Sequence, residues 1–391
     1  MDSVSLDQYY STTRTFDKWM INSNRELVTI PAGTVPVDYS PTSGNKLGIL
    51  VEPYSKNYFI DSEGLSSGVI KSSGVSRTNT SVSGSQYSLH FNGTWNTEET
   101  AGANISLSSD AVALSFFVTM DDGSKPVLGY SGNQDTSFFI MVNGSQINLS
   151  WSDTEIKGPM LDGSYRVRVR IRLYSGLLDR IEIAKPLHHT IGFSISRIQV
   201  EKDHWTSYIP TNGTAQDRPA ETIYRNLTHG VDINENQGSF DVVYSPTPGS
   251  YGSPMTLLKN DWSEYIAFGH QKNEDGYPEV IRFHTDSSIV NTEMRFYDKP
   301  ENITESHSAI RASYSGYGVR GLARNATKVS ILKDYTSFKN GKLNRIQFGE
   351  SFDGTYFCGT IHLVNGYLRT LTDDEMINLS YTPNDSSSGL T

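Results

Sequence analysis

Hydrophobic and polar residues alternate along much of this chain, and the alternation predicts β-strands that bury one face. The clearest example spans residues 165–173. An antiparallel sheet with one solvated face explains it, whereas the strands of a parallel α/β sheet are apolar on both faces. The apolar positions are Tyr165, Val167, Val169, Ile171 and Leu173, and the polar positions are Arg166, Arg168, Arg170 and Arg172.

Turn signals separate the apolar runs. The strongest is Asn143-Gly144, which has strand-like residues on both sides and predicts a tight hairpin. One helix is predicted near the C-terminus, because Thr372 and Glu375 form a capping box before a short apolar face. Further strands are expected at 27–30, 47–51, 113–118, 137–142, 145–151, 197–200, 240–244, 265–268, 280–283, 342–348 and 356–364.

These elements predict an all-β protein with two antiparallel β-sandwich (jelly-roll) domains, an N-terminal hairpin-rich extension and one short C-terminal helix. Each sandwich block is long enough for a core of its own. The expected divisions are an arm and hairpin-rich preamble at 1–53, a first sandwich at 54–214, a linker at 215–235, a second sandwich at 236–381 and a flexible tail at 382–391.

Composition excludes several classes of protein. The chain has 43 acidic and 33 basic residues and a net charge of -10, so no nucleic-acid partner is expected, because duplex binding needs a basic surface. No apolar run reaches the roughly 20 residues of a membrane span. The N-terminus lacks the basic start and apolar core of a secretory signal. Cys358 is the only cysteine, so no intrachain disulfide can form. These features suit synthesis in a bacterial cytoplasm without membrane insertion.

Residues 197–211 combine a buried strand, an acidic turn and an aromatic exit toward Pro210. Glu201 and Asp203 are the closest match to the paired carboxylates of a glycoside hydrolase. Thr206, however, stands where the last acid of an E-x-D-x-x-E pattern would be. The chain also lacks G-x-S-x-G, Walker-type and H-E-x-x-H motifs. We therefore expect no enzymatic activity and no catalytic residue.

Two groups of residues are candidates for binding a ligand. Aromatic side chains beside a polar loop at 260–265 could stack on sugar rings, although most aromatic residues pack in cores or rims. Trp95 and Trp151 are weaker candidates of the same kind. The arginine row of residues 166–172 could pair with phosphate or an acidic sugar, or form a solvated face balanced by acids. The ligand-binding residues predicted here are Trp262, Tyr265, Asp261, Arg166, Arg168 and Arg170.

No residue spacing predicts a metal centre, and no cofactor is expected. The turns at 121–123 and 273–276 carry oxygen atoms that could hold calcium. Both also fit ordinary hairpin turns, which is the simpler interpretation.

Three stretches resemble motifs of bacteriophage tail proteins, and they occur in the same order. Residues 48–53 (GILVEP) resemble the "G-L-L-V-E-P/E" phrase of that family, and residues 57–63 follow where it has "N-L-L-x-x-S-E". Residues 205–211 (WTSYIPT) resemble the strand exit that closes a β-sandwich module in many such proteins. Residues 357–376 resemble the end of a concanavalin A-like (laminin-G-like) domain, with "G-x-I" before "L-(S/T)-D-x-E".

The resemblance covers about residues 12 to 381 and implies a carbohydrate-binding-module-like jelly roll followed by a concanavalin A-like lectin domain. It implies a virion protein of a phage tail or fibre that attaches to host cell-surface glycans, either polysaccharide or lipopolysaccharide. Other virion proteins and further copies of the chain are the expected protein partners. The alternative is a structural decoration or adaptor protein that binds other virion proteins and no glycan.

Overall fold

The computed structural model confirms the all-β prediction, since antiparallel strands dominate and one short helix lies near the C-terminus. No helix in the described ranges is long and apolar enough to cross a membrane. The structure describes residues 9–66, 68–79, 82, 84–228, 230–234, 237–263, 265–270, 343–351 and 354–378, and the strands β23 (Glu279–His284), β24 (Thr292–Arg295), β25 (Ser308–Ser315), β26 (Gly318–Leu322) and β27 (Ser330–Leu332).

The first sandwich is formed by two sheets that enclose one apolar core. One sheet has the order β13-β12-β16-β10-β7 and the other has the order β14-β15-β11-β17-β9-β8. The strands are β7 (Val69–Lys71), β8 (Val75–Thr78), β9 (Ser88–Phe91), β10 (Glu99–Ser108), β11 (Ala111–Met120), β12 (Phe139–Val142), β13 (Ser145–Gln146), β14 (Asp153–Lys157), β15 (Tyr165–Arg172), β16 (Leu177–Lys185) and β17 (Phe193–Lys202).

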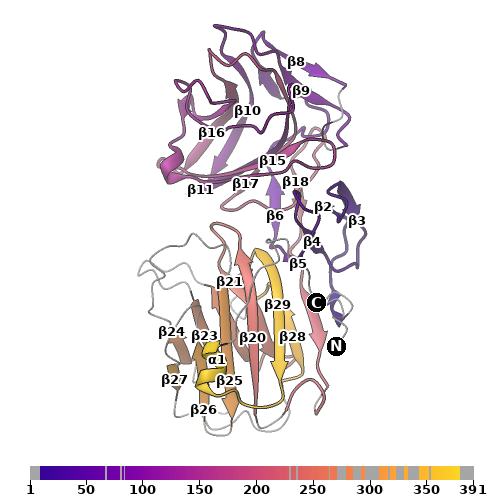
Figure 1. Cartoon of the computed structure of the whole chain (residues 1–391), viewed down its shortest axis with the longest axis vertical. Helices are drawn as coiled ribbons and strands as arrows, with labels where there is room; N and C mark the ends of the chain where they lie inside the picture. Colours follow the sequence, from indigo (N-terminus) through magenta and orange to yellow (C-terminus); the bar gives the residue numbers. More distant parts are fainter. Residues whose placement is uncertain are drawn as a thin grey trace.

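The second sandwich lies below the first in Figure 1 and also has two sheets. Their orders are β1-β19-β28-β21-β22-β23-β24 and β27-β26-β25-β20-β29-β5-β4. The strands not yet given are β1 (Ser11–Thr12), β4 (Val37–Tyr39), β5 (Lys46–Val51), β19 (Ile223–Asn226), β20 (Gln237–Pro246), β21 (Gly252–Leu258), β22 (Tyr265–His270), β28 (Arg345–Phe348) and β29 (Gly359–Tyr367).

Local sequence signals explain several of these elements. The apolar positions of β15 point into the core of the first sandwich, as the alternation predicts. Asn143 and Gly144 have φ values of 50° and 78°, the left-handed pair that a tight hairpin turn requires. The helix α1 (Asp373–Asn378) has the predicted capping box: the Glu375 amide donates to Thr372 Oγ1 at 3.2 Å, and the Thr372 amide donates to Glu375 Oε2 at 2.8 Å.

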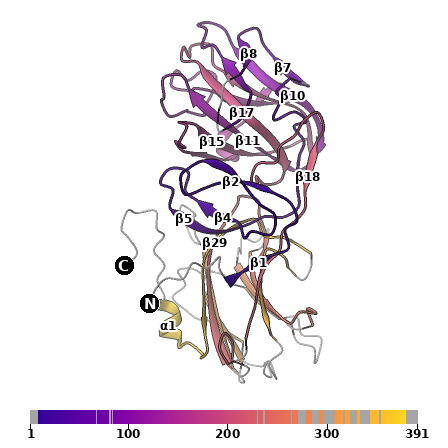
Figure 2. The ribbon, with the colours of Figure 1, turned by 90° about the vertical axis from the view of Figure 1, so that its right-hand side faces the viewer.

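The N-terminal segment belongs to both halves of the molecule. Strands β1, β4 and β5 complete the sheets of the second sandwich, and β5 pairs with β29. Between them, β2 (Lys18–Ile21) and β3 (Leu27–Ile30) form a separate hairpin beside the junction, visible in Figure 2. Strand β6 (Ser55–Asn57) pairs with β18 (Gln216–Arg218), so the chain entering the first sandwich is tied to the chain leaving it. The sandwiches are thus joined by several strands.

Candidate functional site

Residues 205–211 lead out of the first sandwich and are called the exit segment here. They lie at the contact between the two sandwiches, which is called the seam. Trp205 is 5% exposed, and its carbonyl oxygen is 3.8 Å from the Sγ atom of Cys358, which directly precedes β29 in the second sandwich. Cys358 is buried, and burial raises the pKa of its thiol. A buried thiol with a raised pKa is a packing residue, because reactivity requires the thiolate.

A buried cluster of charges holds the seam together, with Glu52 at its centre. Lys18 Nζ and Arg218 Nη2 each lie 2.9 Å from Glu52 Oε2, and the Ser207 amide donates to Glu52 Oε1 at 2.6 Å. Lys18 also pairs with Glu221. Burial alone would raise the pKa of Glu52, but the charges of Arg218 and Lys18 outweigh it and hold that pKa well below its usual range. The cluster connects β2, the end of β5, the exit segment and β18.

Glu201, the first residue of the acidic pair in the sequence, is an interior hydrogen-bond acceptor. It is fully buried and accepts from the Thr206 amide at 2.9 Å and from Gln199 Nε2 at 2.6 Å. Ser55 Oγ also donates to it. This carboxylate fixes the turn that follows β17, and no substrate could reach it.

The three predicted arginines lie on the seam side of the sheet that contains β15. Arg166 is 5% exposed, donates to the Thr206 carbonyl at 2.7 Å and lies 5.6 Å from the Phe117 ring. Arg168 pairs with Glu155 at 2.6 Å, and Arg170 pairs with Asp153 at 3.2 Å. The hairpin of β2 and β3 covers part of the same face, where Ile21 packs with Phe117. These guanidinium groups therefore serve internal contacts.

Glu155 makes the stability of this face sensitive to acid. Burial would raise its pKa, but Arg168 and Lys157 lower the pKa from 4.5 to about 2. A lowered carboxylate pKa stabilises the folded state above the unfolded pKa, and the contribution is lost as the pH falls. We expect the unfolding free energy of the wild type to fall more steeply than that of Glu155→Gln between pH 4.5 and pH 2. Urea titrations at fixed pH values measure both slopes, and parallel slopes would contradict the expectation.

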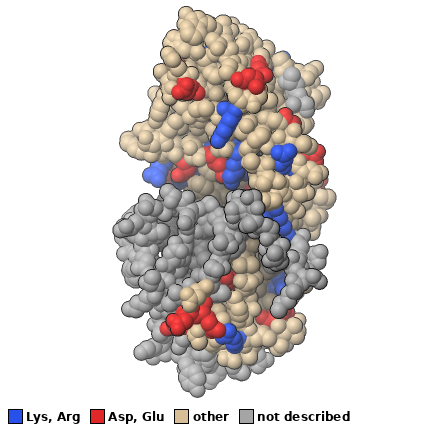
Figure 3. Space-filling model, in the orientation of Figure 1, with Lys and Arg blue, Asp and Glu red and all other residues tan. Residues whose placement is uncertain are grey.

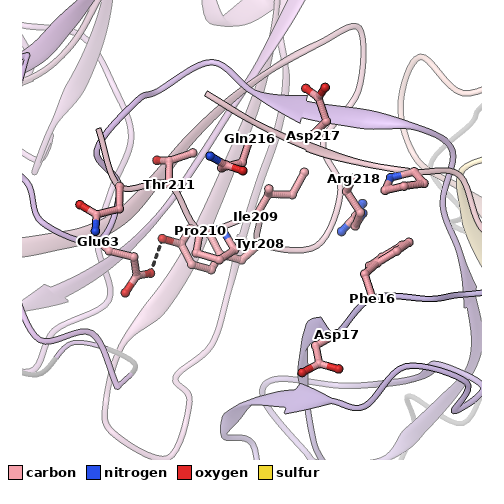
Figure 4. Close-up of a pocket in the computed structure, with 12 residues that line it drawn as sticks. Phe16, Asp17, Glu63, Tyr208, Ile209, Pro210, Thr211, Gln216, Asp217 and Arg218 are labelled. Carbon is pink, nitrogen blue, oxygen red and sulfur yellow. Dashed lines mark hydrogen bonds between the residues drawn. The ribbon is translucent and has the colours of Figure 1, made fainter. Parts of the chain in front are cut away.

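A hollow of about 340 Å³ opens beside the seam (Figure 4). Its walls come from the segment before β2, from Glu63 after β6, from the exit segment and from β18 with the residues beside it. Tyr208 donates to Glu63 at 2.5 Å on one wall, and Arg218 reaches from the hollow to the buried cluster. The lining residues are Phe16, Asp17, Glu63, Tyr208, Ile209, Pro210, Thr211, Asn212, Gln216, Asp217, Arg218 and Pro219.

The predicted aromatic site lies on the turn between β21 and β22. Trp262 is half-exposed and lies 6.2 Å from the Tyr265 ring in an edge-on arrangement, while Tyr265 is 3% exposed. Asp261 is exposed and accepts from Ser263 Oγ at 2.6 Å. Ser263 and Lys259 hold the pKa of Asp261 well below its usual range, so this carboxylate is ionised. The structure thus brings Asp261, Trp262 and Tyr265 together, far along the chain from the arginine row.

The backbone of Trp262 is strained. Its amide donates to the Lys259 carbonyl at 2.8 Å, which closes a turn, and its φ is 59°. Hairpins normally place glycine or asparagine at such a left-handed position, because a side chain there costs about 1–2 kcal/mol. The sequence indicated this tryptophan by its neighbours, but the unfavourable backbone conformation is visible only in the structure.

Other exposed aromatic residues lie on the first sandwich. Trp151 follows β13 in the 3-10 turn η2 (Leu149–Trp151), is 56% exposed and lies 5.5 Å from the Tyr174 ring. Trp95 is 57% exposed and lies 5.2 Å from His188. In Figure 3 the visible face of this sandwich is largely uncharged, and its basic atoms lie mostly toward the junction.

No group of three His, Cys, Asp or Glu side chains is placed to hold a metal ion within the described ranges. In the turn at 121–123, Asp121 Oδ2 lies 2.9 Å from His90 Nε2, and Asp122 Oδ1 accepts from the Ser124 amide at 2.9 Å. The other calcium candidate, at 273–276, lies outside the described residues.

No family model matches this chain, and no curated protein matches it. Domain 4 of the Geobacillus stearothermophilus arabinanase AbnA, in complex with arabinotriose, is a similar solved structure at 13% identity, covering 45% of this chain and 82% of that chain with a TM-score of 0.32. The CBM40 of Ruminococcus gnavus IT-sialidase, bound to α2,3-sialyllactose, is also 13% identical, with 36% and 80% covered and a TM-score of 0.29.

Mouse laminin α1 domains LG4-5 are 10% identical, with 72% of this chain and 91% of that chain covered and a TM-score of 0.25. Two of these three neighbours were solved with a bound saccharide. Likeness at this level concerns the β-sandwich fold and says nothing of a ligand for this chain.

Proposed function

We propose that this chain is a glycan-binding adhesion protein of a phage virion, in the tail or a fibre, and that the Trp262 turn contacts host-surface polysaccharide or lipopolysaccharide. The carrying observation is the strained, half-exposed Trp262 at φ 59°. Strained residues persist at functional sites when the surroundings enforce them, and folding alone would favour glycine at this position.

The neighbours of Trp262 suit a sugar ligand. The buried Tyr265 contacts the indole edge-on, and the ionised Asp261 offers acceptor oxygens to hydroxyl groups. An indole face with a carboxylate at its side can bind both the apolar and the polar surface of a sugar ring. Each such contact is weak, so adhesion would depend on several copies of the chain in a homo-oligomer bound together.

The decisive experiment compares Trp262→Gly with the wild type on purified lipopolysaccharide and capsular polysaccharides of candidate hosts. We expect binding to fall at least tenfold, while the unfolding free energy changes by less than about 1 kcal/mol, because the strain relieved offsets the packing lost against Leu258, Tyr265 and Ala267. A loss of binding without a matching loss of stability would indicate that the tryptophan is kept for binding. Trp95→Gly is the control for removal of an exposed indole elsewhere, since Trp95 is 57% exposed and lies in the first sandwich.

Two outcomes would reject the proposal. If the wild type bound no host polysaccharide but captured purified tail proteins, the chain would be a structural decoration or adaptor protein. If Trp262→Gly bound as well as the wild type, the turn would have no role in attachment. Immunogold labelling of phage particles tests the location, and staining away from the tail and fibres would contradict it.

A further inference from the structure

The hollow beside the seam has the features of a second ligand site, separate from the Trp262 turn. Its volume of about 340 Å³ is at the small end of the range for ligand pockets, which suits one or two rings. Figure 4 shows Phe16 and Asp17 on one side, Glu63 on the opposite side, and labelled residues of 208–211 and 216–218 between them. Four separate segments of the chain therefore converge on a single concave surface.

The lining combines apolar rings with polar groups, as sugar recognition requires. Phe16 is half-buried, and Pro210 of the exit segment adds exposed apolar surface elsewhere in the lining. The side-chain amides of Asn212 and Gln216 are also exposed in the lining and can both donate and accept hydrogen bonds. A sugar unit has apolar ring faces and a rim of hydroxyl groups, and these match the two kinds of lining.

The charges of the hollow determine which sugars it can take. Asp17, Glu63 and Asp217 contribute three carboxylates against the single guanidinium of Arg218. The charge of Arg218 is already matched by the buried Glu52 at 2.9 Å. Lys56 and Arg197 partly offset Asp217 and Glu63 in the same way, so the lining keeps a smaller excess of negative charge, which disfavours an acidic sugar.

The carboxylates are held in place before any ligand arrives. Asp17 Oδ1 accepts from the Ala32 amide at 3.0 Å, and Asp217 pairs with Lys56 at 3.2 Å. Glu63 accepts from Tyr208 and lies 3.5 Å from Arg197 Nη1. Groups fixed by second partners lose little freedom on binding, which favours affinity for a small ligand.

We propose that this hollow binds one uncharged sugar unit of a saccharide and discriminates against sugars that carry carboxylate or phosphate. The proposal rests on the glycan-binding function and adds a second, selective site to it. The arginine row of β15 would favour acidic sugars if it were open, but its side chains are engaged in the seam. The fold thus engages the arginines of β15 in internal contacts and leaves carboxylates in the lining of the hollow. This difference is the reason to expect selectivity for uncharged sugars.

The test is an array of matched neutral and uronate-containing oligosaccharides, followed by titration of the full chain with the strongest neutral one. We expect the neutral member of each pair to bind at least tenfold more tightly. Phe16→Ala and Gln216→Ala should each weaken that binding at least fivefold, and Asp217→Asn should narrow the difference between neutral and acidic partners. Gln216 is exposed, so its variant keeps the test valid even if Phe16→Ala does not fold.

The outcomes separate the two sites. If Trp262→Gly lost binding but Phe16→Ala and Gln216→Ala did not, the hollow would not be a binding site, and the proposed function would stand. If the hollow variants lost binding but Trp262→Gly did not, the hollow would be supported as the sugar-binding site. The Trp262 turn would then be rejected as the contact with the glycan. Equal binding of acidic and neutral oligosaccharides would overturn the claimed selectivity, and binding to neither would overturn the site.

Discussion

Glu52→Gln is expected to destabilise the folded protein by about 3–5 kcal/mol, because it leaves two buried cations without their shared counter-charge. Lys18 and Arg218 both contact this carboxylate at 2.9 Å, and both side chains are almost fully buried. Removing one partner of a buried pair costs more than the pair itself contributes. Urea unfolding at neutral pH measures the change.

The control for this prediction is an exposed ion pair beside the same seam. Asp217 pairs with Lys56 at 3.2 Å, and the side chains are 51% and 32% exposed. Asp217→Asn is expected to change the unfolding free energy by less than about 1 kcal/mol, since solvent screens such pairs. A Glu52→Gln effect as small as this would show that the buried cluster contributes little to stability.

The sequence pattern predicts those strands and turns that are determined by their own residues. The alternation of 165–173 needs only its own residues to define a strand, and Asn143-Gly144 needs only its backbone preference to define a turn. Two long strands of the first sandwich, β10 and β16, gave no comparable signal. Strand β10 is rich in polar and small residues, and two of its four core positions are Ala101 and Ala103, so its alternation is a weak apolar signal.

The seam could not be predicted because its residues are distant in the sequence. Lys18, Glu52 and Glu221 are ordinary charged residues that become a buried cluster only after the chain folds. The alternation predicts that the arginine row forms one face of a strand. It does not predict which distant segments of the chain cover that face. The predicted boundaries at 53/54 and 235/236 remain a prediction, and strand β5 lies before the first of them while pairing with β29.

Gly48→Ala tests whether β5 is an integral strand of the second sandwich. A Cβ atom at position 48 would lie 2.1 Å from the Ile361 carbonyl oxygen and 3.0 Å from His362 Cα, and φ at this glycine is 156°. The obstacle is backbone of β29, which no side-chain rotation can relieve. The new methyl group must push β5 away from its neighbour, and overpacking of this kind costs about 3 kcal/mol. Urea unfolding measures the loss.

Gly144→Ala separates this clash from simple backbone strain. Gly144 has φ 78° in the hairpin turn, and a Cβ atom there would meet nothing within 4 Å. Its replacement is expected to cost about 1 kcal/mol, from the left-handed conformation alone. If both variants lost the same stability, β5 would not be packed against β29, and residues 46–51 would be a loosely attached extension. A loss at Gly48 about three times larger is expected instead, because the strand that precedes the first sandwich is built into the second.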